Sequence, residues 1–562
     1  MGIHNLVTSA IWIESPAATV GLYIDCGSMY ETPGSSGASH LLERMSFKST
    51  TNRSHLRLVR EVESIGGNVS AIATREQMCY TYDAFRAYVP DMVEVLIDSV
   101  RNPTFLDWEV KEQVFHHLKL EEIKAEIAEF SANPQGLLLE ALHSAGYTGA
   151  LANPLIAPEP AIHKLDSSIL KEFIAENYTA PRMVLAASGV EHDVLVSIAE
   201  PLLSDLPAVK RPEEPKSVYV GGDYRCQADC QNTHVALAFE VPGGWYEEKT
   251  AITVTVLQKL MGGGDWFCTG GVGKGLYSRL SLRILSHYHQ IESFSAFNHI
   301  YNYSGLFGIL ATTSPDFASK AVDLAAGELL EVATPGNVTQ GQLDRAKQAA
   351  KCKVLMDLES RAVACEDIGR QVMTYGERKP IEKFLNDVEA ITLNDISSTA
   401  KNIISTPLTM ASWGDVTNVP TYESVSRKFH SKFVAVGNGE IDWCGYALMA
   451  EALALWFGLS LTTTVACNRI EVNSDNIEVI ETMKNGGRGR SFGLSKAVFD
   501  YIYHLACDFS HIIFEHAPKE TNCIARDLAK LVRSKVCAGW MKDPPVEIVD
   551  TLVKDNMVIT LQ

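Results

Sequence analysis

The feature that most constrains the fold is a weak internal repeat within the first 430 residues. Val20–Cys26 and Val235–Glu240 each have the pattern of a half-buried strand, followed by a Gly-containing turn and a helix. Each copy later reaches a Pro-Asp pair before an apolar-periodic helix, at Pro90-Asp91 and at Pro315-Asp316, an offset of 225 residues. Strands and helices mix without a strict βαβ rhythm, which favours an α+β class over a doubly wound sheet.

Length and composition agree with several soluble-type domains. A chain of 562 residues is too long for one hydrophobic core, and 46% hydrophobic residues is ordinary for a globular protein. The two copies are expected at residues 14–206 and 216–428, joined near Pro207 to Pro215, where Lys, Arg, Glu and Pro crowd together. No run of 18 apolar residues occurs, so the sequence predicts no membrane span. The 12 cysteines form no Cys-x-x-Cys pair, which predicts unpaired thiols in a reduced compartment.

Charge is distributed unevenly along the chain. Residues 1–430 hold 36 Lys and Arg against 52 Asp and Glu, a net charge of −16, whereas residues 431–562 carry only −3. An acidic surface can simply keep a protein soluble, or it can attract a basic ligand. Both interpretations stay open at this point.

Residues His40-Leu41-Leu42-Glu43-Arg44 are one residue short of a zinc protease motif. The intact pattern, His-x-x-Glu-His, places two imidazoles at i and i+4 on one helix face to bind Zn²⁺, and its Glu acts as general base. Here Arg44 holds the second ligand position, and a guanidinium has no lone pair to give a metal. Taken alone, a five-residue string with one mismatch is weak evidence, and an amphipathic helix with a satisfied His and a surface Glu43/Arg44 pair explains it more simply. No catalytic set is intact, and Glu43 is a remnant of the general base.

The surrounding text resembles the pitrilysin-like inverted-zincin family, and within it the alpha subunits of processing peptidases. The matching segments are Gly21–Ser28, Gly37–Thr50, Pro134–Glu140, Tyr178–Val184, Tyr277–Leu280 and Tyr375–Pro380. They cover roughly residues 15–430. The resemblance implies two processing-peptidase-like domains in tandem, the first with a degenerate zinc motif.

In catalytic relatives the third zinc ligand is a glutamate about 76 residues after the second histidine. Val114 to Lys119 read as a six-residue insertion here, and correcting for it makes Glu126 the matching residue. The degenerate set is therefore His40 and Glu126, with Arg44 in place of a ligand. The inserted pair His116-His117 cannot form a metal site alone, because adjacent helical residues point about 100° apart.

The second copy has a Gly-rich segment in place of the motif. Seven glycines fall within residues 262–275, namely Gly262, Gly263, Gly264, Gly270, Gly271, Gly273 and Gly275. A phosphate-binding loop is excluded on detail, because Cys268 stands where a Gly is needed and Gly275 where Ser or Thr is needed. The resemblance implies that this mobile loop binds the substrate presequence. Presequences are Arg-rich amphipathic helices, so the acidic charge has the right sign.

The start of the chain departs from the family text. Residues 1–12 contain no Lys or Arg, so no transit peptide is visible. The first strand of the relatives is not found, and we expect Ile11–Glu14 to fill part of it in a truncated first domain.

After Phe429 the text instead resembles a ribonuclease H-like domain, at residues 440–540, of the retroelement type. That class places four carboxylates around two Mg²⁺ ions. Glu451 and Asp475 match two of them, His516 matches the family histidine, and the last position falls on Arg526 with the nearest acid, Asp527, off by one. The first carboxylate is absent. We therefore expect an incomplete α/β domain, with Mg²⁺ bound only if it is active, and its acidic charge argues against nucleic-acid binding.

Together with the replaced ligand at Arg44, the resemblance implies a non-catalytic, presequence-binding alpha subunit. It would help a beta subunit, which carries the Zn²⁺, to remove transit peptides from proteins imported into mitochondria, in the matrix or on the matrix side of the inner membrane. The resemblance also extends to the inner-membrane cytochrome b–c complex. This chain itself is expected to bind no cofactor. The alternatives are an active zinc metalloendopeptidase that uses His40, Glu43 and Glu126 alone, and an RNA–DNA hybrid ribonuclease formed by the C-terminal domain.

Overall fold

The computed structural model describes most of residues 7–430 and short stretches beyond them. The gaps in the first range are 12–15, 119–133, 157–160, 162, 207–208, 210–212, 229 and 266–276. Beyond it the described stretches are 435–437, 469–474, 477–485, 502–504, 506, 511–516 and 539–541. The chain forms two compact units that divide between Tyr422 and Glu423. Each is described by itself.

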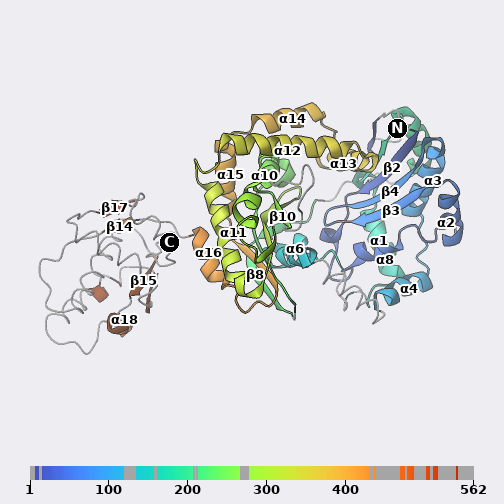
Figure 1. The fold of residues 1–562 in the computed structure, drawn as a ribbon. Coiled ribbons are helices and arrows are strands. Elements are labelled where there is room, and N and C mark those ends of the chain that lie inside the picture. Colours follow the sequence, from blue (N-terminus) through green and yellow to red (C-terminus); the bar gives the residue numbers. More distant parts are fainter. Residues whose placement is uncertain are drawn as a thin grey trace, which may run out of the picture. The chain divides into compact units, whose positions relative to one another are not determined.

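The first unit contains two mixed sheets built to one plan (Figure 1). The first has the order β1-β6-β2-β4-β3, and its strands are β1 (Val7–Ile11), β2 (Ala17–Ile24), β3 (Asn68–Ala73), β4 (Met78–Phe85) and β6 (Met183–Ser188). In both sheets one edge strand is parallel to its neighbour, as β1 is to β6, and the central pairs are antiparallel. The first strand lies at Val7–Ile11. Of residues 11–14, which were expected to fill part of this strand, Ile11 is its last residue, and residues 12–14 lie outside the described residues.

The second sheet repeats this order as β8-β13-β9-β12-β11 and adds one short strand, β10, beside β11. Its strands are β8 (Gly222–Gln227), β9 (Thr233–Glu240), β10 (Gly263–Asp265), β11 (Ile291–Ile300), β12 (Gly305–Thr313) and β13 (Thr409–Gly414). The tandem α+β repeat predicted from the sequence is therefore confirmed.

The helices also correspond between the halves. The first half contains α1 (Ala38–Met45), α2 (His55–Ser64), α3 (Val89–Arg101), α4 (Asp107–Leu118), α6 (Pro134–Gly146), α8 (Ser167–Asn177) and α9 (His192–Leu203). The second contains α10 (Glu248–Met261), α11 (Ala318–Ala333), α12 (Gln340–Leu358), α13 (Arg361–Tyr375), α14 (Ile381–Ala390) and α15 (Leu393–Ile404). Helix α16 (Tyr422–His430) begins at the last residue of the first unit, and its other residues belong to the second. Both Pro-Asp pairs lie where predicted, Pro90 in the first turn of α3 and Pro315 in the short turn before α11, where proline's missing N–H costs nothing.

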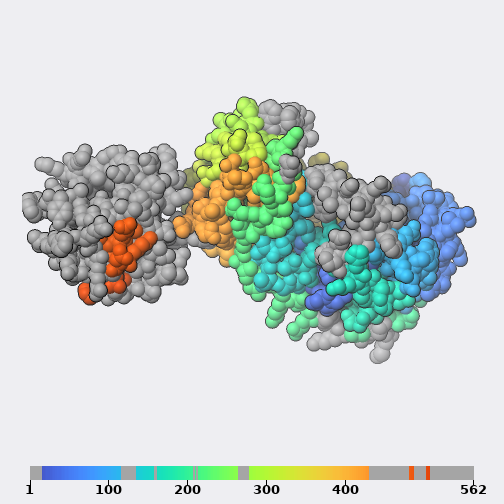
Figure 2. All heavy atoms as spheres, turned by 90° about the horizontal axis from the view of Figure 1, so that it is seen from below, coloured from blue at the N-terminus to red at the C-terminus, as the bar shows by residue number. Residues whose placement is uncertain are grey.

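The two halves exchange one helix each. Helix α13 of the second half packs on β2 and β6 of the first sheet, whereas α6 of the first half packs on β8, β9 and β13 of the second (Figure 1). In the space-filling view, cyan residues of the first half lie against green residues of the second half (Figure 2), in agreement with the packing of α6 on the second sheet. Strands β5 (Tyr147–Gly149) and β7 (Ser217–Tyr219) pair beside α6 and tie the halves together further.

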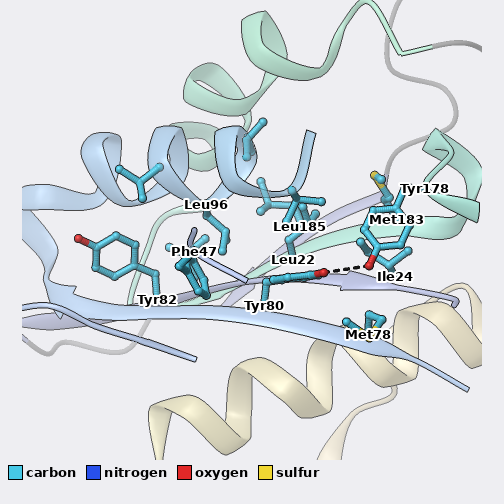
Figure 3. Close-up of a cluster of buried hydrophobic side chains, with 14 of the residues drawn as sticks. Leu22, Ile24, Phe47, Met78, Tyr80, Tyr82, Leu96, Tyr178, Met183 and Leu185 are labelled. Carbon is cyan, nitrogen blue, oxygen red and sulfur yellow. Dashed lines mark hydrogen bonds between the residues drawn. The ribbon is translucent and has the colours of Figure 1, made fainter. Parts of the chain in front are cut away.

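This exchange explains why the central strands are buried on both faces. Alternate residues of β2, such as Leu22 and Ile24, join the main core of the first half (Figure 3), in which the Tyr80 and Tyr178 hydroxyls are 2.9 Å apart. The other face of β2, through Tyr23, packs against Ile368 and Cys365 of α13. The sequence predicted a half-buried strand here, because its pattern cannot show a helix that arrives from another domain.

The second unit contains a small parallel pair. Strand β15 (Arg469–Ser474) runs parallel to β16 (His511–His516), and α18 (Ile477–Lys484) follows β15. A parallel pair with a helical crossover is an α/β unit, as predicted for a ribonuclease H-like region. Short strands β14 (Ala435–Gly437) and β17 (Gly539–Met541) pair antiparallel. None of the helices in the part of the chain that the structure describes has the length and apolar character to cross a bilayer.

Candidate functional site

Helix α1 carries the degenerate zinc motif, and its start is fixed by the half-buried carboxylate of Glu31. Gly37 precedes the helix with φ of 86°, a left-handed conformation suited to glycine. The Glu31 carboxylate accepts the backbone N–H groups of Gly37 and Ser39 at 2.7 and 2.8 Å. Burial raises the pKa of Glu31 to about 7, and these hydrogen bonds oppose the rise. The local frame of the motif is therefore well formed.

The motif residues themselves lie on the less buried side of α1. Leu41, Leu42 and Met45 enter the first core, whereas His40, Glu43 and Arg44 are half-buried. Glu43 Oε2 accepts the backbone N–H of Ala73, on β3, at 3.2 Å. Burial raises the pKa of Glu43, opposed by this hydrogen bond and by the charge of Arg44. The remnant of the general base therefore joins the helix to the sheet.

These residues do not fit a zinc ion. A structural or catalytic zinc needs at least three nitrogen, sulfur or carboxylate ligands. Here the i+4 position presents a guanidinium, which leaves His40 as the one imidazole of the motif. Glu126 lies outside the described residues, and no group of three or more His, Cys, Asp or Glu within the described ranges could hold a metal. Because the Arg44 guanidinium has no lone pair to give a metal, the motif lacks a required zinc ligand.

The base of the Gly-rich segment is a packed structure. Helix α10 ends at Met261, its C-cap Gly262 has a φ of 61°, and Gly263 follows with a φ of 94°. A Cβ on Gly263 would lie 2.0 Å from the carbonyl oxygen of Phe294 on β11, and one on Gly262 would lie 2.3 Å from Cβ of Ser278. Among the predicted glycines, these two are required for close approach. Gly264 lies in β10, and Gly270, Gly271, Gly273 and Gly275 fall outside the described residues.

A residue that the sequence analysis missed joins the two ends of this segment. Ser278 Oγ accepts the backbone N–H of Gly263 at 3.0 Å and donates to Ser281 Oγ at 3.0 Å. Ser278 lies within Tyr277–Leu280, one of the segments that carry the family resemblance. That match was the available signal, although serine at a loop end has no distinctive pattern.

The chain is held firmly just after Ser278. Arg279 is 3% exposed, its Nε donates to Glu328 on α11, and its other nitrogens bind Glu331 and the carbonyl oxygen of Asn337. Arg283 also pairs with Glu331, and with Arg279 it holds the pKa of that carboxyl below its usual range. Charge-assisted pairs of this kind are stronger than neutral hydrogen bonds, so the returning end of the segment is anchored to α11.

Charged side chains also meet where the two halves join. Arg75 is buried and binds both oxygens of Glu140, on α6, at 3.0 Å. Its neighbour Glu76 accepts the backbone N–H of Asn302, at the tip of the β11–β12 hairpin, at 2.8 Å. Burial raises the pKa of Glu76 to about 8, and the charges of Glu214 and Asp25 add to the rise. Glu76 lies at the tip of the β3–β4 hairpin of the first half, and Asn302 lies at the tip of the equivalent β11–β12 hairpin of the second. The two hairpin tips therefore meet at the buried carboxyl group of Glu76.

In the second unit the predicted nuclease remnants are only partly described. The backbone of His516 ends β16, in register with Ser474 at the end of β15. Glu451, Asp475 and Asp527 themselves lie outside the described residues.

Comparison with protein-family models divides the chain in three. Residues 10–159 match the insulinase family (peptidase family M16), and residues 164–350 match the peptidase M16 inactive domain. Residues 421–532 match the reverse transcriptase-like family, which supports the ribonuclease H-like region predicted at the C-terminal end.

Individual relatives agree with the first two matches. Mitochondrial-processing peptidase subunit alpha of Solanum tuberosum is 65% identical over 418 residues, 74% of this chain and 82% of the potato protein. A probable alpha-2 subunit of Arabidopsis thaliana is 61% identical over 76% of this chain and 84% of its own length. Cytochrome b-c1 complex subunit 2 of Homo sapiens is 32% identical over 74% of this chain and 89% of its length. A chain of complex III2 from Candida albicans shares the fold, with a TM-score of 0.63 at 18% identity over 76% of this chain and 99% of that chain.

Proposed function

The chain belongs to the insulinase-type M16 peptidase family, and we propose that it acts there as a non-catalytic, alpha-type subunit of a mitochondrial processing peptidase. In this role it binds the presequence of an imported protein and completes the binding chamber of a beta subunit, which supplies the Zn²⁺ and the cut. A curated relative named as a mitochondrial-processing peptidase subunit beta, from Pongo abelii, is 31% identical over 72% of this chain, so the partner belongs to the same family.

One observation carries the non-catalytic assignment. Helix α1 is intact, capped and packed, yet Arg44 stands where a zinc ligand is required. Glu43, the remnant of the general base, is joined to the N–H of Ala73. Helix α1 keeps its packing although its second zinc-ligand position is occupied by Arg44, and this supports a structural role for the helix. The alternative of an active zinc peptidase would need Zn²⁺ bound by His40 and Glu126 beside a permanent positive charge.

Electrostatics support the substrate class. The first 430 residues carry a net charge of −16, and presequences are Arg-rich amphipathic helices. Opposite charge accelerates encounter and favours basic ligands over neutral ones. Relatives named as mitochondrial proteins support a mitochondrial location. The proposal places the chain in the matrix or on the matrix side of the inner membrane. The relatives named as cytochrome b-c1 complex subunit 2 are the reason to include assembly with the inner-membrane cytochrome b–c complex in the proposal.

Presequence binding is tested by fluorescence anisotropy with a labelled, Arg-rich amphipathic peptide. We expect the purified chain to bind this peptide, to bind a variant with Arg replaced by Gln several-fold more weakly, and to cleave neither. Adding a beta subunit should produce cleavage. Equal binding of both peptides would contradict the presequence-binding role, and cleavage by the chain alone would contradict the non-catalytic one.

The second candidate function is ribonuclease H activity of the C-terminal unit, and the sequence of that unit argues against it. The reverse transcriptase-like match and the parallel β15–β16 pair favour a ribonuclease H ancestry. Arg526 in place of the last carboxylate argues against Mg²⁺-dependent cleavage. An RNA–DNA hybrid assay with Mg²⁺ should therefore show no cleavage above that of an Asp475→Asn variant.

A further inference from the structure

Each hairpin tip at the junction of the two halves lies against a short 3₁₀ turn. In the first half this turn is η1 (Ser28–Tyr30), and the backbone N–H groups of Ser28 and Met29 donate to the tip of the β3–β4 hairpin. The acceptors are the carbonyl oxygens of Thr74 and Arg75, at 3.3 and 3.0 Å. Ser28 is 1% exposed and Met29 is 5% exposed. The first half therefore forms this contact with buried side chains.

The second half repeats the contact with the turn η5 (Gly244–Tyr246). Trp245 N donates to the carbonyl oxygen of Tyr301 at 2.8 Å, and Tyr246 N donates to that of Asn302 at 3.2 Å. A Cβ on the first residue of η5 would lie 2.2 Å from the Tyr301 carbonyl oxygen. The turn thus packs directly on the tip of the β11–β12 hairpin, with the same pair of backbone hydrogen bonds as in the first half.

The side chains at the equivalent places differ. By these hydrogen bonds Tyr246 corresponds to Met29, yet it is 45% exposed. Tyr303 is the third residue of its hairpin tip, as Glu76 is of the other, and it is 64% exposed whereas Glu76 is buried. The backbone arrangement therefore does not require aromatic side chains, and the second half presents two of them to solvent.

Tyr246 and Tyr303 form one exposed aromatic surface beside carboxylates. Their ring centroids are 4.7 Å apart, with an interplanar angle of 49°. Glu214 and Glu240 accept hydrogen bonds, at 3.5 and 2.9 Å, from the side chains of the residues on either side of Tyr303. Exposed Glu247 directly follows Tyr246. Because the face of an aromatic ring carries partial negative charge, the rings and the carboxylates both favour a cation.

The chain already pairs guanidinium groups with aromatic rings at both turns. The guanidinium of Arg370 lies 5.2 Å from the centroid of the Trp245 ring in η5, and that of Arg182 lies 4.1 Å from the centroid of the Tyr30 ring in η1. A guanidinium is planar and weakly hydrated, so it stacks on aromatic rings more readily than an ammonium group does. An arginine side chain is therefore the cation that this surface fits best.

We propose that Tyr246 and Tyr303 form a binding site for an arginine side chain of the presequence. This inference rests on the proposed function, because it names side chains that contact the basic peptide. A tyrosine ring has few rotatable bonds, and both rings extend from a turn and a tip that are fixed by backbone hydrogen bonds. The site is therefore preorganised, and binding costs little conformational entropy.

The test is fluorescence anisotropy of the full chain with the Arg-rich amphipathic peptide and its counterpart in which Gln replaces Arg. Tyr246→Ala and Tyr303→Ala should each raise the Kd of the Arg-rich peptide about twofold to fivefold, as expected for a cation–π contact at an exposed site. Neither should change the Kd of the Gln peptide. Tyr303→Phe keeps the aromatic face and should recover the affinity lost in Tyr303→Ala. The matched control is Tyr88→Ala, which removes an exposed tyrosine of the first half and should change neither Kd.

The outcomes separate this inference from the proposed function. An unchanged Kd of the Arg-rich peptide in both alanine variants would overturn the arginine site. An equal loss of affinity for the two peptides would also overturn it, because the rings would then contact apolar side chains. Circular dichroism checks folding, and Tyr303→Lys replaces an alanine variant that does not fold. Its added positive charge should weaken binding of the Arg-rich peptide at least twofold, and an unchanged Kd would again overturn the site. If the unaltered chain binds neither peptide, the proposed function itself fails.

Discussion

At the residue scale, the contact between Glu76 and the Asn302 N–H makes the junction of the two halves sensitive to pH. Its carboxyl group is buried at the hairpin tip, and Asp25 and Glu214 add negative charge, while Arg370 opposes them. Its pKa is raised to about 8 in the folded chain from 4.5. The folded state therefore holds this proton between about pH 5 and pH 8, whereas the unfolded chain releases it.

The free energy of unfolding is accordingly expected to fall as pH rises through this window. Glu76→Gln stays neutral and keeps an acceptor for the Asn302 N–H, so it should flatten that fall and stabilise the protein at pH 8 by about 1–3 kcal/mol. Urea unfolding at pH 5, 6.5 and 8 measures this. Glu247→Gln, at an exposed position, is the control. An identical pH profile in Glu76→Gln and the unaltered chain would rule the mechanism out.

Arg44 is the second residue whose chemistry can be tested directly. Arg44→His places two imidazoles at i and i+4 on the face of α1, so zinc affinity should rise roughly tenfold or more. Isothermal titration with Zn²⁺ provides the measurement. Arg57→His, at an exposed position of α2 without a histidine four residues before it, should show no such gain. A gain shared by both variants would indicate surface binding instead.

At the element scale, the exchanged helices decide how the halves hold together. Gly369 of α13 packs against Tyr23 of β2, and a Cβ there would lie 2.3 Å from the ring. Gly369→Ala should destabilise the first unit by about 1–3 kcal/mol through overpacking. Gly327→Ala in α11, with nothing within 4 Å, should instead stabilise by about 0.5–1 kcal/mol. Thermal unfolding of both variants checks the pair, and equal effects would contradict the packing account.

Some features of these elements could be predicted from the sequence, and others could not. The repeat and the two Pro-Asp helix starts were predictable, because they follow from local pattern and from proline's missing N–H. The exchange of α6 and α13 was not, since periodicity shows that Ile368 is buried but not which sheet covers it. In the site, the loss of a zinc ligand at Arg44 could be predicted, because an arginine side chain cannot bind a metal ion. The hydrogen bonds of Ser278 could not be predicted, because its partners are a backbone N–H and a second serine.

At the scale of the whole molecule, the chain combines an M16 unit of two halves with a second unit of different ancestry. The M16 unit keeps the helix, sheet and Gly-rich segment of a processing peptidase and lacks a complete set of ligands at its motif. The acidic charge is concentrated in this unit, as expected for a protein that binds basic peptides. The central claim is therefore a division of labour, with binding in this chain and cleavage in its partner.

The most direct test is presequence cleavage by the reconstituted heterodimer carrying Glu43→Gln in this chain. The amide oxygen of the introduced side chain retains an acceptor for the Ala73 N–H, so the helix should stay in place. We predict a cleavage rate equal to that of the unaltered heterodimer, while the same Glu→Gln change in the zinc motif of the beta subunit abolishes cleavage. A loss of rate on the order of a hundredfold from Glu43→Gln in this chain, with assembly intact, would contradict the account.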